Sequence, residues 1–155
     1  MKIIKNMKNI LIEVIINNQC NKRCQYCDLD FKNKSLSKEN IDDFLFFLNS
    51  NKSKVNYFHI NFFGWEPLLS FDKIKYFVEN NKVENIKFSI WTNWDLFDDV
   101  KIYFLIKNNF KIQISIDNIT WIKNYDFLSK YSNFLEINFI NDPDYLDNSK
   151  IIFQT

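Results

Sequence analysis

Short runs in which apolar and polar residues alternate are separated along the chain by longer runs in which apolar residues recur at helical spacing. The alternating runs predict strands, and the longer runs predict helices between them. This order is typical of repeated βα units that build a parallel sheet. The predicted strands are residues 10–16, 57–63, 86–91, 111–116 and 135–140.

Helices are predicted over residues 37–48, 71–79 and 96–107. Ser37 and Ser70 are the expected N-caps of the first two, because a serine oxygen can accept a bond from a free N–H of the first turn. Residues 121–131 are poorly periodic and have room for a short helix, and residues 151–153 could begin a sixth strand.

Each predicted strand is apolar on one face and polar on the other. Parallel strands covered by helices on both faces should be apolar on both. The pattern therefore favours an α/β fold, a partial (β/α) barrel of five to six parallel strands with helices on its outer face only. The alternative is a three-layer sandwich with a few hydrogen-bonded buried polar groups. The polar positions include Glu13, Asn17, His59, Asn61, Ser89, Asn93, Gln113, Ser115, Asp117, Glu136 and Asn138.

Composition limits the classes of function. The 155 residues are 46% hydrophobic, which suits a single domain over residues 1–155. Twenty basic against nineteen acidic residues make nucleic acid or anionic lipid an unlikely partner on charge alone. With a single glycine in the chain, Asn is expected to form the turns at 17–18, 80–81 and 108–109.

The first residues show no signal-peptide pattern, and no apolar run approaches a membrane span. We therefore expect a cytoplasmic protein without membrane contact. In that compartment cysteines act more often as metal ligands or reactive thiols than as disulfides.

The cysteines Cys20, Cys24 and Cys27 form a C-x-x-x-C-x-x-C pattern directly after the first predicted strand. Three thiolates can hold three corners of an iron–sulfur cluster and leave one iron open to another ligand. A structural zinc site is the alternative, but it normally needs four protein ligands. The chain has no fourth cysteine, and its lone His59 lies inside a predicted strand.

The cysteine segment resembles the signature of radical S-adenosylmethionine (radical SAM) enzymes, including the Asn after the first cysteine and the aromatic residue before the third. Three further segments resemble the family's motifs in the family's order, over about residues 8 to 141. Gly64-Trp65-Glu66-Pro67 resembles GGEP, Thr92-Asn93-Trp94 resembles TNG, and Ser115-Ile116-Asp117-Asn118 resembles S-x-D-G.

The resemblance implies an enzyme in which Cys20, Cys24 and Cys27 hold a 4Fe-4S cluster. It implies S-adenosylmethionine as cofactor, an external one-electron reductant, and a 5′-deoxyadenosyl radical that abstracts hydrogen from a substrate. The implied cofactor-binding residues are Tyr26, Gly64, Trp65, Glu66, Pro67, Thr92, Asn93, Ser115 and Asp117. For Tyr26 a role as a core aromatic is an equal alternative.

Three family glycines are replaced here, by Trp65, Trp94 and Asn118. If the backbone at Trp65 must be left-handed, a side chain there costs about 1–2 kcal/mol. The indole could instead cover the substrate side of the pocket.

Several residues have two readings. Glu13 and Glu136 are expected to face the cavity, as substrate ligands or as ion-pair partners. His59 is expected to line the barrel as a hydrogen-bonded residue rather than to act as a ligand or base. Phe63 and Trp91 are either a stacking surface or a plug of the barrel.

The substrate is not readable from the motifs. A peptide-modifying enzyme, an activase of a glycyl-radical enzyme, and a non-catalytic cluster- or zinc-binding module all remain open. The few residues after the fifth predicted strand suggest an open sheet edge, covered by a partner or by the substrate itself. Such an opening favours a peptide or protein substrate over a small metabolite.

Overall fold

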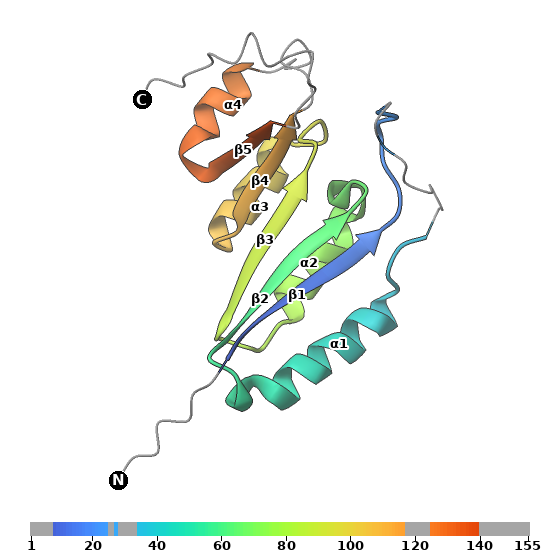
Figure 1. Cartoon of the computed structure of the whole chain (residues 1–155), viewed down its shortest axis with the longest axis vertical. Coiled ribbons are helices and arrows are strands. Elements are labelled where there is room, and N and C mark those ends of the chain that lie inside the picture. The colour runs from blue at the N-terminus through green and yellow to red at the C-terminus, as the bar shows by residue number, and fades with distance from the viewer. Residues whose placement is uncertain (1–7, 25–26, 28–33, 117–124, 140–155) are drawn as a thin grey trace.

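The computed structural model describes residues 8–24, 27, 34–116 and 125–139. Five parallel strands form one sheet in the order β1-β2-β3-β4-β5, and helices follow the strands along the chain (Figure 1). The predicted α/β fold is confirmed. The strands are β1 Asn9–Asn17, β2 Tyr57–Gly64, β3 Ile86–Thr92, β4 Lys111–Ile116 and β5 Leu135–Phe139.

The helices are α1 Lys38–Asn51, α2 Phe71–Asn80, α3 Asp99–Lys107 and α4 Tyr125–Tyr131, with 3-10 turns η1 Lys52–Lys54, η2 Pro67–Ser70 and η4 Ser132–Phe134. Helix α4 occupies part of the poorly periodic stretch. Residues 151–153, the candidate sixth strand, lie outside the described residues. None of the described helices is long and apolar enough to span a membrane.

One face of the sheet packs against the helices. Buried strand residues such as Ile60, Phe62 and Ile90 join buried helix residues such as Ile74 and Leu105 in one hydrophobic cluster. Phe62 makes an edge-to-face contact with Phe77 of α2, with ring centroids 5.3 Å apart. These contacts place the apolar strand positions toward the helices, as the alternation predicts.

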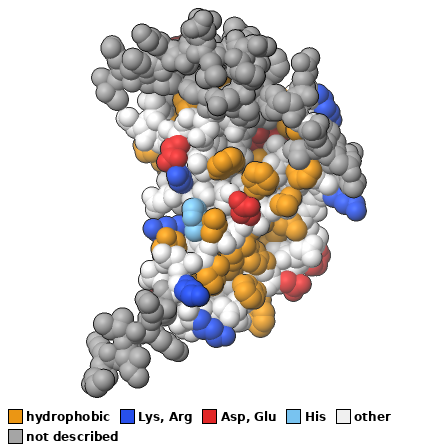
Figure 2. Space-filling view, viewed as in Figure 1, with side chains coloured by type: hydrophobic (Ala, Val, Ile, Leu, Met, Phe, Trp, Pro, Cys, Tyr) orange, Lys and Arg blue, Asp and Glu red, His pale blue; other side chains and the backbone are white. Residues whose placement is uncertain are grey.

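The other face is not covered by any described helix, so the three-layer alternative is wrong for the part of the chain that the structure describes. Leu11 is 61% exposed and Ile15 is 55% exposed on this face. Hydrophobic side chains and the single histidine are visible together here (Figure 2). We call this surface the open face.

The helix caps explain two boundary differences. Ser37 caps α1 as predicted, since its hydroxyl accepts from Asn40 N at 3.2 Å. Helix α3 begins at Asp99, three residues later than predicted, because the Asp98 carboxylate accepts from Lys101 N at 2.8 Å. Ser70 stands at the predicted N-cap position of α2, but its side chain makes no capping hydrogen bond.

Asparagine forms turns in two different ways. Asn109 adopts the left-handed conformation, with φ 55°. Asn17 and Asn81 instead use their side-chain oxygens, which accept from Gln19 N and Val83 N, both at 3.1 Å. The predicted turn positions are therefore correct, but a left-handed backbone is needed at only one of the three.

Candidate functional site

The candidate site lies at the carboxyl ends of the strands, where β1 and β2 approach each other closely. The register shifts between Ile15 and Asn17, and Asn17 pairs with Gly64 at the end of β2. Gly64 has φ 148°, and a Cβ there would lie 2.7 Å from the Asn17 carbonyl oxygen. The single glycine of the chain therefore stands where no side chain fits.

Glu66 joins the ends of β2 and β3. Its side chain is fully buried, and one carboxylate oxygen accepts from Leu68 N at 2.9 Å and Thr92 Oγ1 at 2.7 Å. The other accepts from Asn93 N at 2.8 Å. Burial raises the pKa of Glu66 despite these hydrogen bonds. The carboxylate therefore positions the Thr92–Asn93 segment against the end of β2.

Asn17 and Ser70 complete this network, and sequence reasoning missed both as site residues. Asn17 Nδ2 donates to the Glu66 carbonyl oxygen at 2.9 Å and to Ser70 Oγ at 3.0 Å. Both side chains are buried. The sequence did contain one indication for Asn17: it is a polar residue at the end of the first strand, on the same face as the other polar positions.

The segment that carries the cysteines leaves the end of β1 and returns beside it. Asn17 forms an antiparallel bridge with Ser35, and Asn18 N donates to the Lys34 carbonyl oxygen at 3.1 Å. Gln19, in the loop, accepts a hydrogen bond through its carbonyl oxygen from Glu66 N, which follows β2, at 2.8 Å. The loop is thus fixed to the end of β2 one residue before the first cysteine.

Asn93 connects the same loop to β3. Its side-chain nitrogen donates to Asn21 Oδ1 at 2.8 Å and lies 3.7 Å from Cys20 Sγ. Cys20 Sγ also accepts from Lys22 N at 3.3 Å, and Lys22 forms an ion pair with Asp95 at 3.4 Å. The motif segments at the ends of β2 and β3 therefore both contact the cysteine loop.

The three cysteines are half-buried, and none of them is in a disulfide. Burial raises the pKa of Cys20, and the Glu66 and Cys27 side chains add to this effect. Among the described residues, no three Cys, His, Asp or Glu side chains are gathered closely enough to hold a metal ion. Three thiols in one loop, with two N–H donors directed at Cys20, are nevertheless a donor set that suits a three-thiolate centre. The ligand role of Cys24 and Cys27 stays a prediction.

The replaced glycines differ in their backbone. Trp65 is not in the left-handed region, so the strain considered there is absent. Trp94 is left-handed, with φ 63°, and its side chain is only 6% exposed. The Nε1 atom of Trp65 is buried and has no hydrogen-bond partner. Among the described residues, it is the only buried side-chain nitrogen or oxygen in this state. Asn118 lies outside the described residues.

The remaining predicted site residues are less closely connected. Pro67 is buried at the start of η2. Ser115 is half-buried on β4, opposite Asn138 of β5, and no hydrogen bond of the described structure links it to the Glu66 network. Tyr26 and Asp117 lie outside the described residues. Their predicted contacts with the cofactor stay predictions.

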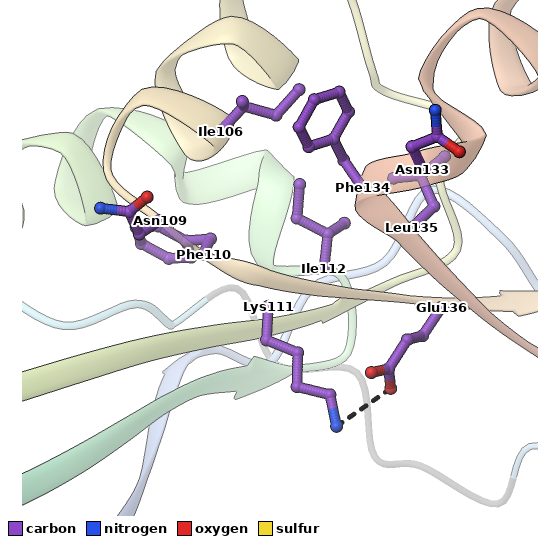
Figure 3. A pocket seen from close by; sticks show the side chains of 9 residues that line it. All are labelled: Ile106, Asn109, Phe110, Lys111, Ile112, Asn133, Phe134, Leu135 and Glu136. Carbon is purple, nitrogen blue, oxygen red and sulfur yellow. Dashed lines mark ion pairs between the residues drawn. The ribbon is translucent and has the colours of Figure 1, made fainter.

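A cavity of about 430 Å³ lies at the opposite end of the sheet, where β4 and β5 begin (Figure 3). Ile106, Phe110 and Phe134 supply much of its wall. Lys111 and Glu136 form an ion pair there, with nitrogen and oxygen 3.0 Å apart. Glu136 is therefore an ion-pair partner, one of its two predicted roles. This cavity is separate from the cysteine loop.

No protein-family model matches the chain, and no curated protein does. Solved structures match it in fold. Native anSMEcpe with bound AdoMet and the Cp18Cys peptide matches with TM-score 0.64 and 21% identity, over 84% of this chain and 42% of that one. BtrN in complex with AdoMet and 2-DOIA matches with TM-score 0.65 and 20% identity, over 92% of this chain and 59% of that one. The chain thus spans about half the length of these structures.

Proposed function

We propose that this chain is the catalytic domain of a radical SAM enzyme, with residues 1–155 as one domain. The observation that carries the proposal is the contact of Glu66 and Asn93 with the cysteine loop. It brings two of the motif segments to the cysteines at the edge where parallel α/β folds bind their ligands. The bound AdoMet in two structures of the same fold supports it.

Cys20, Cys24 and Cys27 would hold a 4Fe-4S cluster, and the ends of β2, β3 and β4 would bind S-adenosylmethionine. Together these groups supply one-electron cleavage of the sulfonium and a 5′-deoxyadenosyl radical that abstracts hydrogen from the substrate. An external reductant provides the electron.

The protein's own residues orient and shield the site. The N–H groups of Lys22 and Asn93 near Cys20 Sγ would stabilise a thiolate there and partly offset the burial that raises the pKa of Cys20. Glu66 acts as a positioning residue, because its buried carboxylate accepts hydrogen bonds from Leu68, Thr92 and Asn93. It holds Asn93 where the side chain reaches the cysteine loop.

A peptide or protein is the proposed substrate class. The uncovered face of the sheet, with exposed Leu11 and Ile15, suits a large substrate better than a closed pocket would. The same fold solved with a bound peptide is consistent with this class. We place the enzyme in the cytoplasm.

A non-catalytic module that binds a cluster or zinc is the second candidate. It is favoured by Trp94, a buried side chain at a family glycine position next to Asn93.

Anaerobic reconstitution with iron, sulfide and a strong reductant separates the two. The enzyme should form 5′-deoxyadenosine from S-adenosylmethionine and should lose its brown colour and iron when all three cysteines are replaced by Ala. Stoichiometric zinc without iron in folded protein would overturn the cluster, and iron without 5′-deoxyadenosine would favour the module.

A further inference from the structure

The side chain of Asn93 has a fixed orientation at the end of β3. Its Oδ1 accepts from the backbone N–H of Asp95 at 3.2 Å, and its own backbone N–H donates to Glu66 Oε2 at 2.8 Å. Because a backbone N–H can only donate, the Asn93 side-chain atom that contacts Asp95 N must be the oxygen. The amide nitrogen is therefore the atom that contacts the cysteine loop.

Both hydrogens of this nitrogen have acceptors in the cysteine loop. Asn93 Nδ2 donates to Asn21 Oδ1 at 2.8 Å and lies 3.7 Å from Cys20 Sγ, a distance at which sulfur accepts a hydrogen bond. An amide nitrogen carries two hydrogens, so these two contacts use its whole donor capacity. The Nδ2 group is thus engaged by the loop rather than left free for a cofactor.

Two N–H groups converge on Cys20 Sγ, and they differ in origin. Lys22 N, at 3.3 Å, belongs to the same loop and lies two residues after the cysteine. Asn93 is 73 positions away in the sequence and reaches the sulfur from the end of β3. The Asn93 donor is also a side chain, so a substitution can remove it without changing the backbone of the cysteine loop.

The effect of such a donor on a metal centre has a definite sign. Hydrogen bonds to the sulfur ligands are among the factors that set the reduction potential of an iron–sulfur cluster. One electron from an external reductant adds one negative charge to the centre, so an N–H directed at a ligand sulfur stabilises the reduced form more than the oxidised form. Asn21 Oδ1, 3.8 Å from the same sulfur, is an acceptor and opposes negative charge there.

We propose that Asn93 is a positioning residue that raises the reduction potential of the iron–sulfur centre through its Nδ2–H bond to Cys20 Sγ, and that its side chain is not a ligand of S-adenosylmethionine. This deepens the proposed function and rests on it, because it takes Cys20 as a cluster ligand. Glu66 supports the arrangement, since its bond to Asn93 N fixes the backbone from which the amide reaches the sulfur.

The first test compares reduction potentials of the full chain after anaerobic reconstitution with iron and sulfide, by redox titration monitored by EPR without S-adenosylmethionine. Asn93→Ser removes the amide donor and keeps an oxygen that can accept from Asp95 N. At a fixed solution potential its ratio of reduced to oxidised centre should fall about tenfold, which is about 59 mV for one electron. Asn93→Asp keeps the side-chain size but replaces the donor with a negative oxygen, and should lower the potential further.

Asn21→Ser is the matched control. It removes the other acceptor of Asn93 Nδ2, and with it a bond that anchors the loop, but it leaves the donor to Cys20 Sγ in place. Its potential should be unchanged or higher, because the amide oxygen near the sulfur is lost as well. Unchanged potentials in both Asn93 variants, or an equal fall in Asn21→Ser, would overturn the proposal.

A second measurement uses the unsubstituted protein and so does not depend on cluster uptake by the variants. Asparagine labelled with ¹⁵N only at the side-chain nitrogen is incorporated, and pulsed EPR of the reduced centre should detect a coupled ¹⁵N nucleus. The coupling should persist in Asn21→Ser, which excludes the amide of Asn21 as its source. Absence of the coupling in the unsubstituted protein would overturn the bond to Cys20.

Affinity for S-adenosylmethionine separates the two possible roles of Asn93. Isothermal titration should give the same dissociation constant for Asn93→Ser and the unsubstituted protein. Weaker binding with an unchanged potential would assign the side chain to the cofactor and overturn the proposal. Stoichiometric zinc without iron would overturn the proposed function as well. An iron centre that forms 5′-deoxyadenosine but keeps its potential in the Asn93 variants would overturn only the role given to Asn93.

Discussion

The two ends of the sheet differ in what they bury. At the carboxyl ends, Asn17, Glu66 and Thr92 are buried polar residues joined by hydrogen bonds. At the amino ends, a cavity of about 430 Å³ is lined by apolar side chains such as Phe110 and Leu135 together with polar ones such as Asn109 and Lys111. A buried polar group that lacks a hydrogen-bond partner destabilises the folded state, whereas a fully bonded network makes the structure around it rigid. The concentration of such bonds at the carboxyl ends therefore indicates that this end has a well-defined geometry.

The largest effect should follow from Gly64→Ala at the carboxyl end. The new methyl group would lie 2.7 Å from a backbone oxygen at φ 148°. Overpacking and the unfavourable backbone together should lower the free energy of unfolding by about 4 kcal/mol. Urea denaturation measures this. Asn109→Gly, at a left-handed position near the amino end, is the control and should be neutral or slightly stabilising. If Gly64→Ala lowered the free energy of unfolding no more than the control changes it, the ends of β1 and β2 would be able to separate easily.

Trp94→Gly tests whether the strained backbone or the buried indole dominates at the end of β3. Loss of a buried Trp side chain costs about 3–5 kcal/mol, while relief of the left-handed backbone returns about 1–2 kcal/mol. We expect a net loss of about 2 kcal/mol in unfolding free energy. Trp91→Gly, on the open face, should cost less. A stabilised Trp94→Gly variant would contradict the packing of this side chain.

Glu66→Gln should have a smaller, pH-dependent effect. The amide replaces the oxygen that accepts from Asn93 N, so the loss should be about 1 kcal/mol at low pH. Because folding raises the pKa of Glu66, its stabilising contribution is full below its ordinary pKa and declines as the pH rises through the raised one. The deficit of the variant should therefore shrink as the pH rises.

Denaturation of both proteins at several pH values checks this, with Glu84→Gln, an exposed residue, as the control without a trend. A deficit that grows with pH would show that the folded state prefers the ionised carboxylate.

Phe134→Ala at the rim of the amino-end cavity should have the smallest effect. The side chain is 52% exposed, so we expect a change within about 0.5 kcal/mol and unchanged binding of S-adenosylmethionine. Isothermal titration of the cofactor and urea denaturation test the two halves of this statement. Weakened cofactor binding would contradict the division between the two ends.

The sequence by itself determined most of the fold. Alternation in each strand reports directly which side chains face the core, because successive residues point to opposite faces. It therefore predicted the strands, the covered face with Ile60 and Ile90, and the open face with Phe63 and Trp91. The order of strands and helices also predicted that the motif segments would meet at one edge of a parallel sheet.

Only the tertiary structure decided how those segments contact one another. The approach of β1 to β2 makes Gly64 indispensable, and the hydrogen bonds of Asn17, Glu66 and Asn93 join residues 26 to 73 positions apart. Local patterns carry no information on such distant partners. For the same reason, the sequence suggested a left-handed backbone at Trp65, whereas the structure has it at Trp94. Backbone dihedrals at the end of a strand depend on the path of the turn that follows.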